Sequence, residues 1–546
     1  MSSVKKEWLT THRTAIFIVL NVGVLLLALI GGPLHGIDIG RGIYAALLFL
    51  LCSVPLLSLS ALNGRFFLLA VFMAFYFLIF GALDLQALLM GEEIHPAHEG
   101  FLEPAEVAIL SGALMVLLGY FAGVGWGSRG QDLQPPKEWP KHTIAILGAT
   151  LWVVGIAAVI YFQVFTIPEK SNAAAARGFA AMGPMLTFIV MLGHLLGPLG
   201  VLILAYGYAR FRGLHWLVLI LLVVASHVVV GFISDIKAEA MMGGVIVILV
   251  KTLVDNRLPR AWLAGGLAFI ILAFPVFQAY RVEVAGERGL NRLQALKELP
   301  KVLAIAISAR DKVSTGHPGE RSQTFLERSS SKGNIEILMS HAGVDTPFLH
   351  GRTLVAIPMA FVPRLIAPDK EDISVGQLFT KQILKSGSDT YISISHLGEL
   401  YWNFGWLGIF AVLPLTGFLL GTVGGRSSLE TRLSMTRLLM LMATVQPLCL
   451  GFGGTMPVSY VIWLRSTAAI GLLHVMFARR VWVARPADAS ADPRIGSRAD
   501  SSEAAEPMAA PAPVAAPGRY PAPLVREPDA GVRLALPPPR FPNLLR

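Results

Sequence analysis

Long apolar runs recur along the chain, and each is bounded by polar or charged residues. The hydrocarbon core of a bilayer is about 30 Å thick, which takes about 20 helical residues at a rise of 1.5 Å each. We therefore expect an all-α polytopic membrane protein with about twelve transmembrane helices, at 14–31, 42–61, 66–86, 104–126, 142–163, 183–208, 214–233, 239–254, 261–280, 396–424, 437–453 and 457–478. Of these, the run 239–254 is short and also fits a re-entrant segment.

The apolar runs divide the chain into four parts. Residues 1–280 hold nine predicted spans, 281–395 form a large loop without a credible span, 396–480 hold the last three spans, and 481–546 form a tail rich in Ala and Pro. The loop is not of low complexity. Its stretches 290–308 and 324–341 mix apolar and charged residues and favour helices lying at a membrane surface. We expect an ordered outer subdomain, followed after the last span by a disordered cytoplasmic tail.

Positive charge is distributed unevenly between the two sides of the predicted bundle. With twelve spans, alternate connections fall on one side together with both termini, and these are rich in Lys and Arg, whereas 87–103 on the other side is acidic. Lys and Arg accumulate in cytoplasmic loops. The pattern predicts both termini in the cytoplasm and the loop 281–395 outside, in the periplasm. The basic residues on the predicted inner side are Lys5, Lys6, Arg13, Arg65, Arg129, Lys137, Lys141, Arg210, Arg212, Lys251, Arg257, Arg260, Arg426, Arg432, Arg437, Arg479 and Arg480.

Composition agrees with a lipid environment. The chain is 54% hydrophobic and 15% charged, whereas soluble domains are about 25% charged. The net charge of +10 is explained by the inner loops, so no nucleic-acid partner is expected. Cys52 and Cys449 both lie in apolar runs and predict no disulfide framework. The first run lacks a small-residue cleavage site and reads as an uncleaved anchor helix rather than a signal peptide.

Signatures of nucleotide and metal chemistry are absent from the sequence. There is no Gly-x-x-x-x-Gly-Lys loop, no His-Glu-x-x-His and no Cys-x-x-Cys, so neither ATP hydrolysis nor catalytic zinc is expected. No cofactor and no metal is predicted. His194 and His227 stand alone in apolar spans, where a packing role and a functional role both remain open.

Candidate chemistry lies in the outer loop and where it returns to the membrane. Guanidinium groups suit bidentate phosphate binding, and Arg281, Arg328, Arg352 and Arg364 are expected near one membrane boundary. Glu399 is the only acid in the returning segment 396–406. A carboxyl half-buried there would have a raised pKa, which suits a general base. Three other readings stay open: lipid headgroup contacts for the arginines, a Glu399–Arg364 ion pair, and an interfacial aromatic belt of Tyr401, Trp402 and Trp406.

Two stretches resemble a known family. The sequence Gly-Glu-Leu-Tyr-Trp-Asn-Phe-Gly-Trp-Leu-Gly at 398–408, opening a span, is similar to bacterial oligosaccharide repeat-unit polymerases, the Wzy-type O-antigen and exopolysaccharide polymerases. So is the upstream Pro363-Arg364 followed by Pro368-Asp369-Lys370 at the end of a large outer loop. The resemblance covers roughly 261–425, and elsewhere only the architecture agrees. The Ala/Pro tail does not belong to the family pattern.

The resemblance implies a membrane glycosyltransferase without cofactor or metal, on the outer face of the bacterial inner membrane. It would join undecaprenyl-diphosphate-linked repeat units into O-antigen or exopolysaccharide. Its partners would be the lipid-linked donor and acceptor, membrane lipids, a chain-length regulator and a flippase. The expected site has Glu399 as base with His396 behind it, and Tyr401, Trp402 and Asn403 at the acceptor sugar. The departing diphosphate would contact Arg281, Arg328, Arg352, Arg364, Lys370 and Arg465.

Two alternatives come from other activities. A lipid-linked glycan ligase would use the same cationic loop to move a finished chain to another acceptor. A transporter or flippase fits the span number, but transporters place charged groups near the middle of the membrane. Such charges are sparse here, with Arg465 in the last span as the clearest exception.

Overall fold

The computed structural model describes most of the helical part of the chain. All described residues fall in the first of two compact units, Met1–Arg485. The predicted disordered tail lies outside them except for residues 481–483, which belong to a helix. Most of the predicted helix at 290–308 lies outside them as well. The described residues are 3–34, 37–57, 65–91, 102–129, 139–162, 184–234, 237–255, 259–279, 301, 304, 326, 329–362, 375–387, 391–427 and 434–483.

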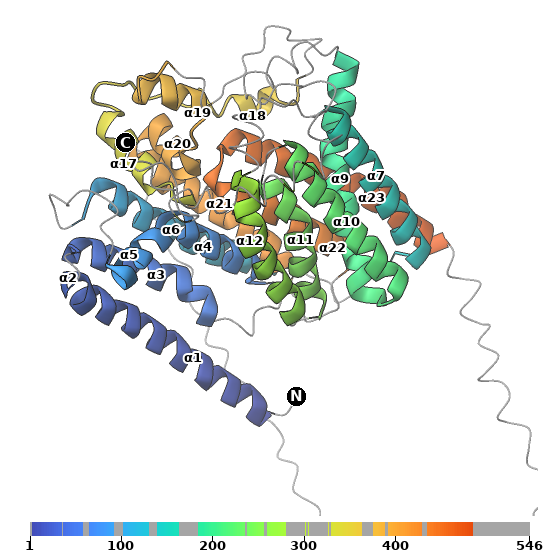
Figure 1. The fold of residues 1–546 in the computed structure, drawn as a ribbon, viewed down its shortest axis with the longest axis horizontal. Coiled ribbons are helices and arrows are strands. Elements are labelled where there is room, and N and C mark those ends of the chain that lie inside the picture. Colours follow the sequence, from blue (N-terminus) through green and yellow to red (C-terminus); the bar gives the residue numbers. More distant parts are fainter. Residues whose placement is uncertain are drawn as a thin grey trace, which may run out of the picture. The chain divides into compact units, whose positions relative to one another are not determined.

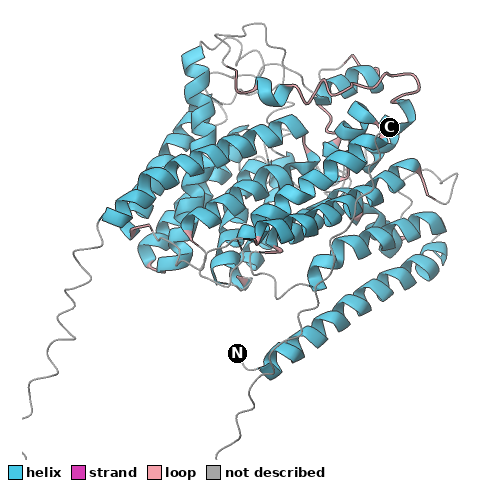
Figure 2. Cartoon of the chain, turned by 180° about the vertical axis from the view of Figure 1, so that it is seen from behind, coloured by secondary structure: helices cyan, strands magenta, loops and turns pink. Residues whose placement is uncertain are grey.

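Within these ranges the protein is all-α, and Figure 2 shows helices joined by loops without a strand. The first half contains α1 (Ser3–Leu26), the π-helical turn η1 (Leu27–Gly31), α2 (Gly32–Leu34), α3 (Ile39–Leu57), α4 (Phe67–Phe80), α5 (Ala82–Met90), α6 (Pro104–Gly127), α7 (Lys141–Tyr161), α9 (Pro184–Phe211), α10 (Leu214–Ser234), α11 (Lys237–Asp255) and α12 (Arg260–Ala279). The second half contains α17 (Lys332–His341), α18 (Ala356–Met359), α19 (Val375–Leu378), η5 (Phe379–Ile383), α20 (Ser395–Phe404), α21 (Trp406–Arg426), α22 (Met435–Thr444), η6 (Val445–Cys449), η7 (Leu450–Gly453) and α23 (Met456–Val483).

Every predicted span falls on helix in the described part. Seven helical segments there are long and apolar enough to cross a membrane, and an eighth is added if α4 and α5, which bend by 56° at Gly81, form one span. The helix α17 covers the carboxyl-terminal part of the predicted loop helix at 324–341. The full count of twelve spans, and their orientation, remain predictions.

The predicted span 396–424 is not one continuous helix. It breaks at Gly405, whose φ of +61° ends α20 before α21 begins at Trp406. Such a backbone conformation is rarely adopted by residues other than glycine. Only α21 is long enough to cross the membrane, so α20 is a separate short helix that precedes the span.

Helices α6 and α21 pack closely enough for backbone to touch backbone (Figure 1). A Cβ atom added at Gly123 would lie 2.1 Å from the carbonyl oxygen of Phe418, and one added at Gly421 would lie 2.1 Å from that of Tyr120. In lipid, where apolar burial provides little attraction between helices, close contact of small residues is a main source of packing energy. This pair forms the centre of the bundle beside which α20 and α17 lie.

Candidate functional site

Helix α20 carries five of the residues that the sequence assigns to the site. It begins at Ser395, whose φ is +60° and whose hydroxyl accepts a hydrogen bond from the Gly398 N–H at 3.5 Å. One face of α20 packs on α17, where Gly398 lies against Leu338 and Ile335. Another face meets the first turn of α23. The helix is therefore held inside the protein rather than at a lipid boundary.

The carboxyl group of Glu399 is fully buried, not half-buried as the sequence suggested. Its Oε2 accepts a hydrogen bond from the Met456 N–H at 2.8 Å. Met456 is the first residue of α23, and the free N–H groups and dipole at a helix amino terminus favour a carboxylate. Among the described residues Oε1 has no hydrogen-bond partner.

Burial raises the pKa of Glu399 from its ordinary value of 4.5 to about 7, against the opposing influence of the nearby Thr353 hydroxyl and the Met456 N–H. A carboxyl group with such a pKa exchanges its proton near neutral pH. This is the property that a general base requires. The alternative pairing with Arg364 stays open, because Arg364 lies outside the described residues.

His396 lies one turn before Glu399 and is also buried. Its Nε2 is 3.0 Å from the Ser459 hydroxyl, again in the first turns of α23, and its ring packs on Phe452. Burial lowers the pKa of His396 to about 3, so the imidazole is neutral. His396 can orient the amino-terminal end of α23, which in turn donates to Glu399.

Asn403 lies one turn beyond Glu399 and joins α20 to the loop segment that contains Thr353. Its amide Nδ2 donates to the Thr353 hydroxyl at 2.7 Å and to the Glu399 backbone carbonyl at 2.8 Å. Its Oδ1 is buried and has no partner among the described residues. Two acceptor oxygens without partners, on Glu399 and Asn403, therefore belong to the same buried region of α20.

The two aromatic candidates differ in position. Trp402 is fully buried against Phe379, so it is a core residue and not part of an interfacial belt. Tyr401 is 9% exposed and packs edge-on against Phe348 and Trp406. Of the two, only Tyr401 reaches the surface of the described structure.

Two of the six predicted diphosphate contacts lie in the described residues. Arg352 is exposed and directly precedes Thr353. Arg465, on α23, is half-buried; its guanidinium donates to the Ala360 carbonyl at 2.8 Å and stacks on Phe361. Both thus belong to, or touch, the loop segment 352–361. The other four, Arg281, Arg328, Arg364 and Lys370, lie outside the described residues, so their convergence on Glu399 remains a prediction.

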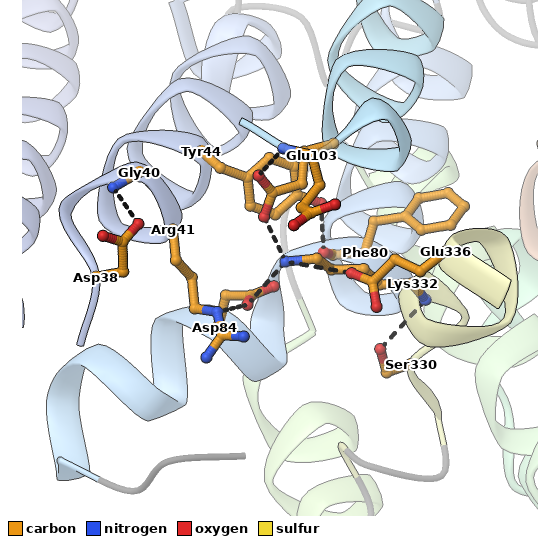
Figure 3. A network of polar contacts seen from close by, with 11 residues as sticks. Asp38, Gly40, Arg41, Tyr44, Phe80, Asp84, Glu103, Ser330, Lys332 and Glu336 are labelled. Atoms are coloured by element: carbon orange, nitrogen blue, oxygen red, sulfur yellow. Dashed lines mark hydrogen bonds and ion pairs between the residues drawn. The ribbon is translucent and has the colours of Figure 1, made fainter. Parts of the chain in front are cut away.

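A buried ionic network at the start of α17 was not predicted. The Lys332 Nζ lies 2.7 Å from Glu106 Oε1. It also lies 3.1 Å from Asp84 Oδ1 and 4.4 Å from the centre of the Tyr44 ring (Figure 3). Arg41 Nε is 3.7 Å from Asp84. Lys332 is 1% exposed and Glu106 is fully buried. Two buried cations and two buried carboxylates thus balance one another, and the partly exposed Glu336 lies 3.9 Å from the Lys332 Nζ as well.

The four buried charges of this network each lie in the first turn of a helix. Arg41, Asp84, Glu106 and Lys332 open α3, α5, α6 and α17 respectively. The carboxylates are favoured there by the helix dipoles. The network thus joins the ends of three bundle helices to the loop helix α17, and α17 in turn holds the segment before α20 through Asn334, which donates to the Ser393 carbonyl at 2.9 Å. The charges lie at helix ends, not in the middle of spans.

Two sequence signals pointed to this network. Asp84 and Glu106 are acids inside predicted apolar spans, and a charge in such a place needs a partner. The partner, Lys332, is more than 200 residues away in the chain, and no local pattern reveals it. The described residues contain no group of three or more His, Cys, Asp or Glu side chains that could hold a metal ion.

The described helices define a class: the chain is a multi-pass helical membrane protein. Comparison with protein-family models, with curated proteins and with solved structures finds no match that would assign it to a particular family.

Proposed function

We propose that this protein polymerises undecaprenyl-diphosphate-linked oligosaccharide repeat units into O-antigen or exopolysaccharide, at the outer face of the bacterial inner membrane. The observation that supports it best is Glu399, a fully buried carboxyl whose pKa is raised to about 7 and whose Oε1 has no partner among the described residues. A base of this kind is needed for glycan transfer to a hydroxyl group.

In the proposed reaction, the acceptor hydroxyl oxygen attacks the anomeric carbon of the donor glycan. The bond between that carbon and the phosphate oxygen breaks, undecaprenyl diphosphate leaves with the bonding electrons, and Glu399 takes the hydroxyl proton. The donor carries its energy in the anomeric phosphate bond, which agrees with a sequence lacking nucleotide-binding motifs.

Charge stabilisation of the leaving diphosphate is assigned to cationic side chains of the outer loop. Arg352 is exposed beside Thr353, whose hydroxyl accepts from Asn403 one turn away from Glu399. Because Glu399 is buried, the proposal requires the segment around Thr353 to move away from α20 before the acceptor enters. Lids that close over reacting groups are common in enzymes.

The test uses the purified full-length protein and one substrate, a defined lipid-linked repeat unit, with no nucleotide sugar present. A polymerase converts it into lipid-linked products of two, three and more units. Glu399→Gln should remove this activity, whereas Glu239→Gln, which changes a partly buried acid in the first turn of α11, should keep it. Full activity of the Glu399→Gln variant would exclude Glu399 as the base. A wild-type protein that makes no longer product, yet transfers glycan to a different added acceptor, is a ligase.

A further inference from the structure

A hollow of about 600 Å³ lies where α9, α10 and α11 meet, far along the chain from the site at α20. Its lining combines an aromatic ring, two cations and two leucines: Tyr208, Arg212, Gly213, Leu214, Leu217 and Lys251. It is at the turn between α9 and α10, on the side that the distribution of positive charge predicts to be cytoplasmic.

The two cations of the hollow are held side by side. Arg212 and Lys251 both bind the Asp255 carboxylate, at 3.1 Å and 2.7 Å, and the Lys251 ammonium also lies 5.3 Å from the centre of the Tyr208 ring. The Tyr208 hydroxyl in turn accepts from the Trp262 indole at 3.2 Å. One acid shared by two cations leaves an excess positive charge at the opening.

The backbone of Arg212 is in the left-handed region, with φ of +40°. A helix such as α9 commonly ends with Gly at this position, and Gly213 is the next residue. A residue with a side chain is strained in this conformation. Left-handed residues other than Gly concentrate at functional sites. The Arg212 side chain is 75% exposed despite its ion pair, so it remains accessible to a ligand.

An apolar stripe begins at the same place. Leu214, Val218, Leu221 and Leu222 are spaced by about one helical turn along α10, and each is about half exposed or more. Residues at i, i+4, i+7 and i+8 share one face of a helix. Cations at one end and an apolar face running away from them are the two features that a phospholipid molecule, with its headgroup and acyl chains, would cover.

We propose that this hollow binds one anionic phospholipid, with the headgroup phosphate at Arg212 and Lys251 and the acyl chains along the apolar stripe of α10. A free anion would use the cations but leave the stripe uncovered. A zwitterionic lipid would cover the stripe but gain less from the excess charge. The inference does not depend on the function proposed for Glu399.

Native mass spectrometry of the full-length protein with added phosphatidylglycerol tests the site. A basic residue near a membrane surface contributes about 1 kcal/mol to the binding of anionic lipid, which corresponds to about fivefold in affinity. We expect Arg212→Gln to lower the affinity of the most tightly bound phosphatidylglycerol molecule by about fivefold. Val218→Ser should also lower this affinity. Arg129→Gln, which removes an exposed arginine after α6 on the same predicted side, should leave it unchanged.

Three results would overturn the proposal. Equal weakening by Arg129→Gln would mean that only net charge matters. Equal affinity for phosphatidylcholine would mean that the headgroup charge is not recognised. Full competition by millimolar inorganic phosphate, together with no effect of Val218→Ser, would mean that the hollow takes a free anion.

Discussion

Substitution of Gly123 by Ala tests the close backbone contact between α6 and α21. The added Cβ would lie 2.1 Å from the Phe418 carbonyl oxygen, whereas real Cβ atoms essentially never come closer than 3.0 Å. The obstacle is backbone, which cannot rotate out of the way as a side chain can. Helices α6 and α21 must therefore separate locally by about 1 Å, which weakens the neighbouring contacts at Gly421 as well.

The expected magnitude follows from two opposing effects. Insertion of a methyl group into a closely packed region costs about 1–3 kcal/mol, and replacement of Gly by Ala in a helix returns up to about 1 kcal/mol. We expect Gly123→Ala to lower the free energy of unfolding by about 1–2 kcal/mol. Gly125 lies on the same helix with no atom within 4 Å of an added Cβ, so Gly125→Ala should be neutral or slightly stabilising.

The measurement is unfolding of the two variants in mixed micelles as the fraction of denaturing detergent rises, followed by far-ultraviolet circular dichroism. The difference between the variants matters more than either value, because both gain the same helix propensity. If Gly123→Ala and Gly125→Ala unfold at the same detergent fraction, α6 and α21 do not touch through their backbones and the reasoning is wrong.

Four further predictions concern charge and the tail. Lys332→Met should destabilise the protein by about 3–5 kcal/mol, because it removes the buried cation bonded to both Glu106 and Asp84. Adding Glu106→Gln should recover part of the loss in the same unfolding assay, and no recovery would argue against direct pairing. The raised pKa of Glu399 means that the folded state holds more protons than the unfolded state between pH 4.5 and about 7. The free energy of unfolding should therefore fall by about 3 kcal/mol as the pH rises through this window, and stay level above it. Glu399→Gln should flatten that slope, and an unchanged slope would mean that another group titrates. Deprotonation of Glu399 should also make polymer growth rise with pH around 7, and a rate that is flat from pH 6 to 8 would contradict its role as base. Truncation before Pro486 should leave the unfolding of the helical unit unchanged, which comparison with the full chain will check.

Helix positions were predictable because apolar length alone decides them. The predicted spans 104–126 and 214–233 match α6 (Pro104–Gly127) and α10 (Leu214–Ser234) almost to the residue. In lipid each backbone polar group must be satisfied within its own helix, so a long apolar run has few other conformations. Local breaks were harder: the run through Gly405 is apolar on both sides, and hydropathy does not report the φ of a single glycine.

The candidate site was predicted only as a set of residue types. The sequence indicated Glu399 and His396 as candidate catalytic residues in a short segment. Their burial, however, depends on α17 and on the first turns of α23, which are distant in the chain. Trp402 looked interfacial because a Trp beside a span often is, yet a neighbouring loop element covers it. Burial and pKa depend on what surrounds a residue, and that is set by packing.

By itself, the sequence determined that this is a multi-pass helical membrane protein. It also predicted where the described apolar helices lie and which side chains could take part in chemistry. Only the tertiary structure decided that Lys332 pairs with Glu106 and Asp84, that α6 and α21 meet through glycines, and that Glu399 faces the start of α23. The physical reason is range: helix formation in an apolar run depends on neighbours within a few residues, whereas an ion pair or a helix contact joins residues separated by hundreds of positions.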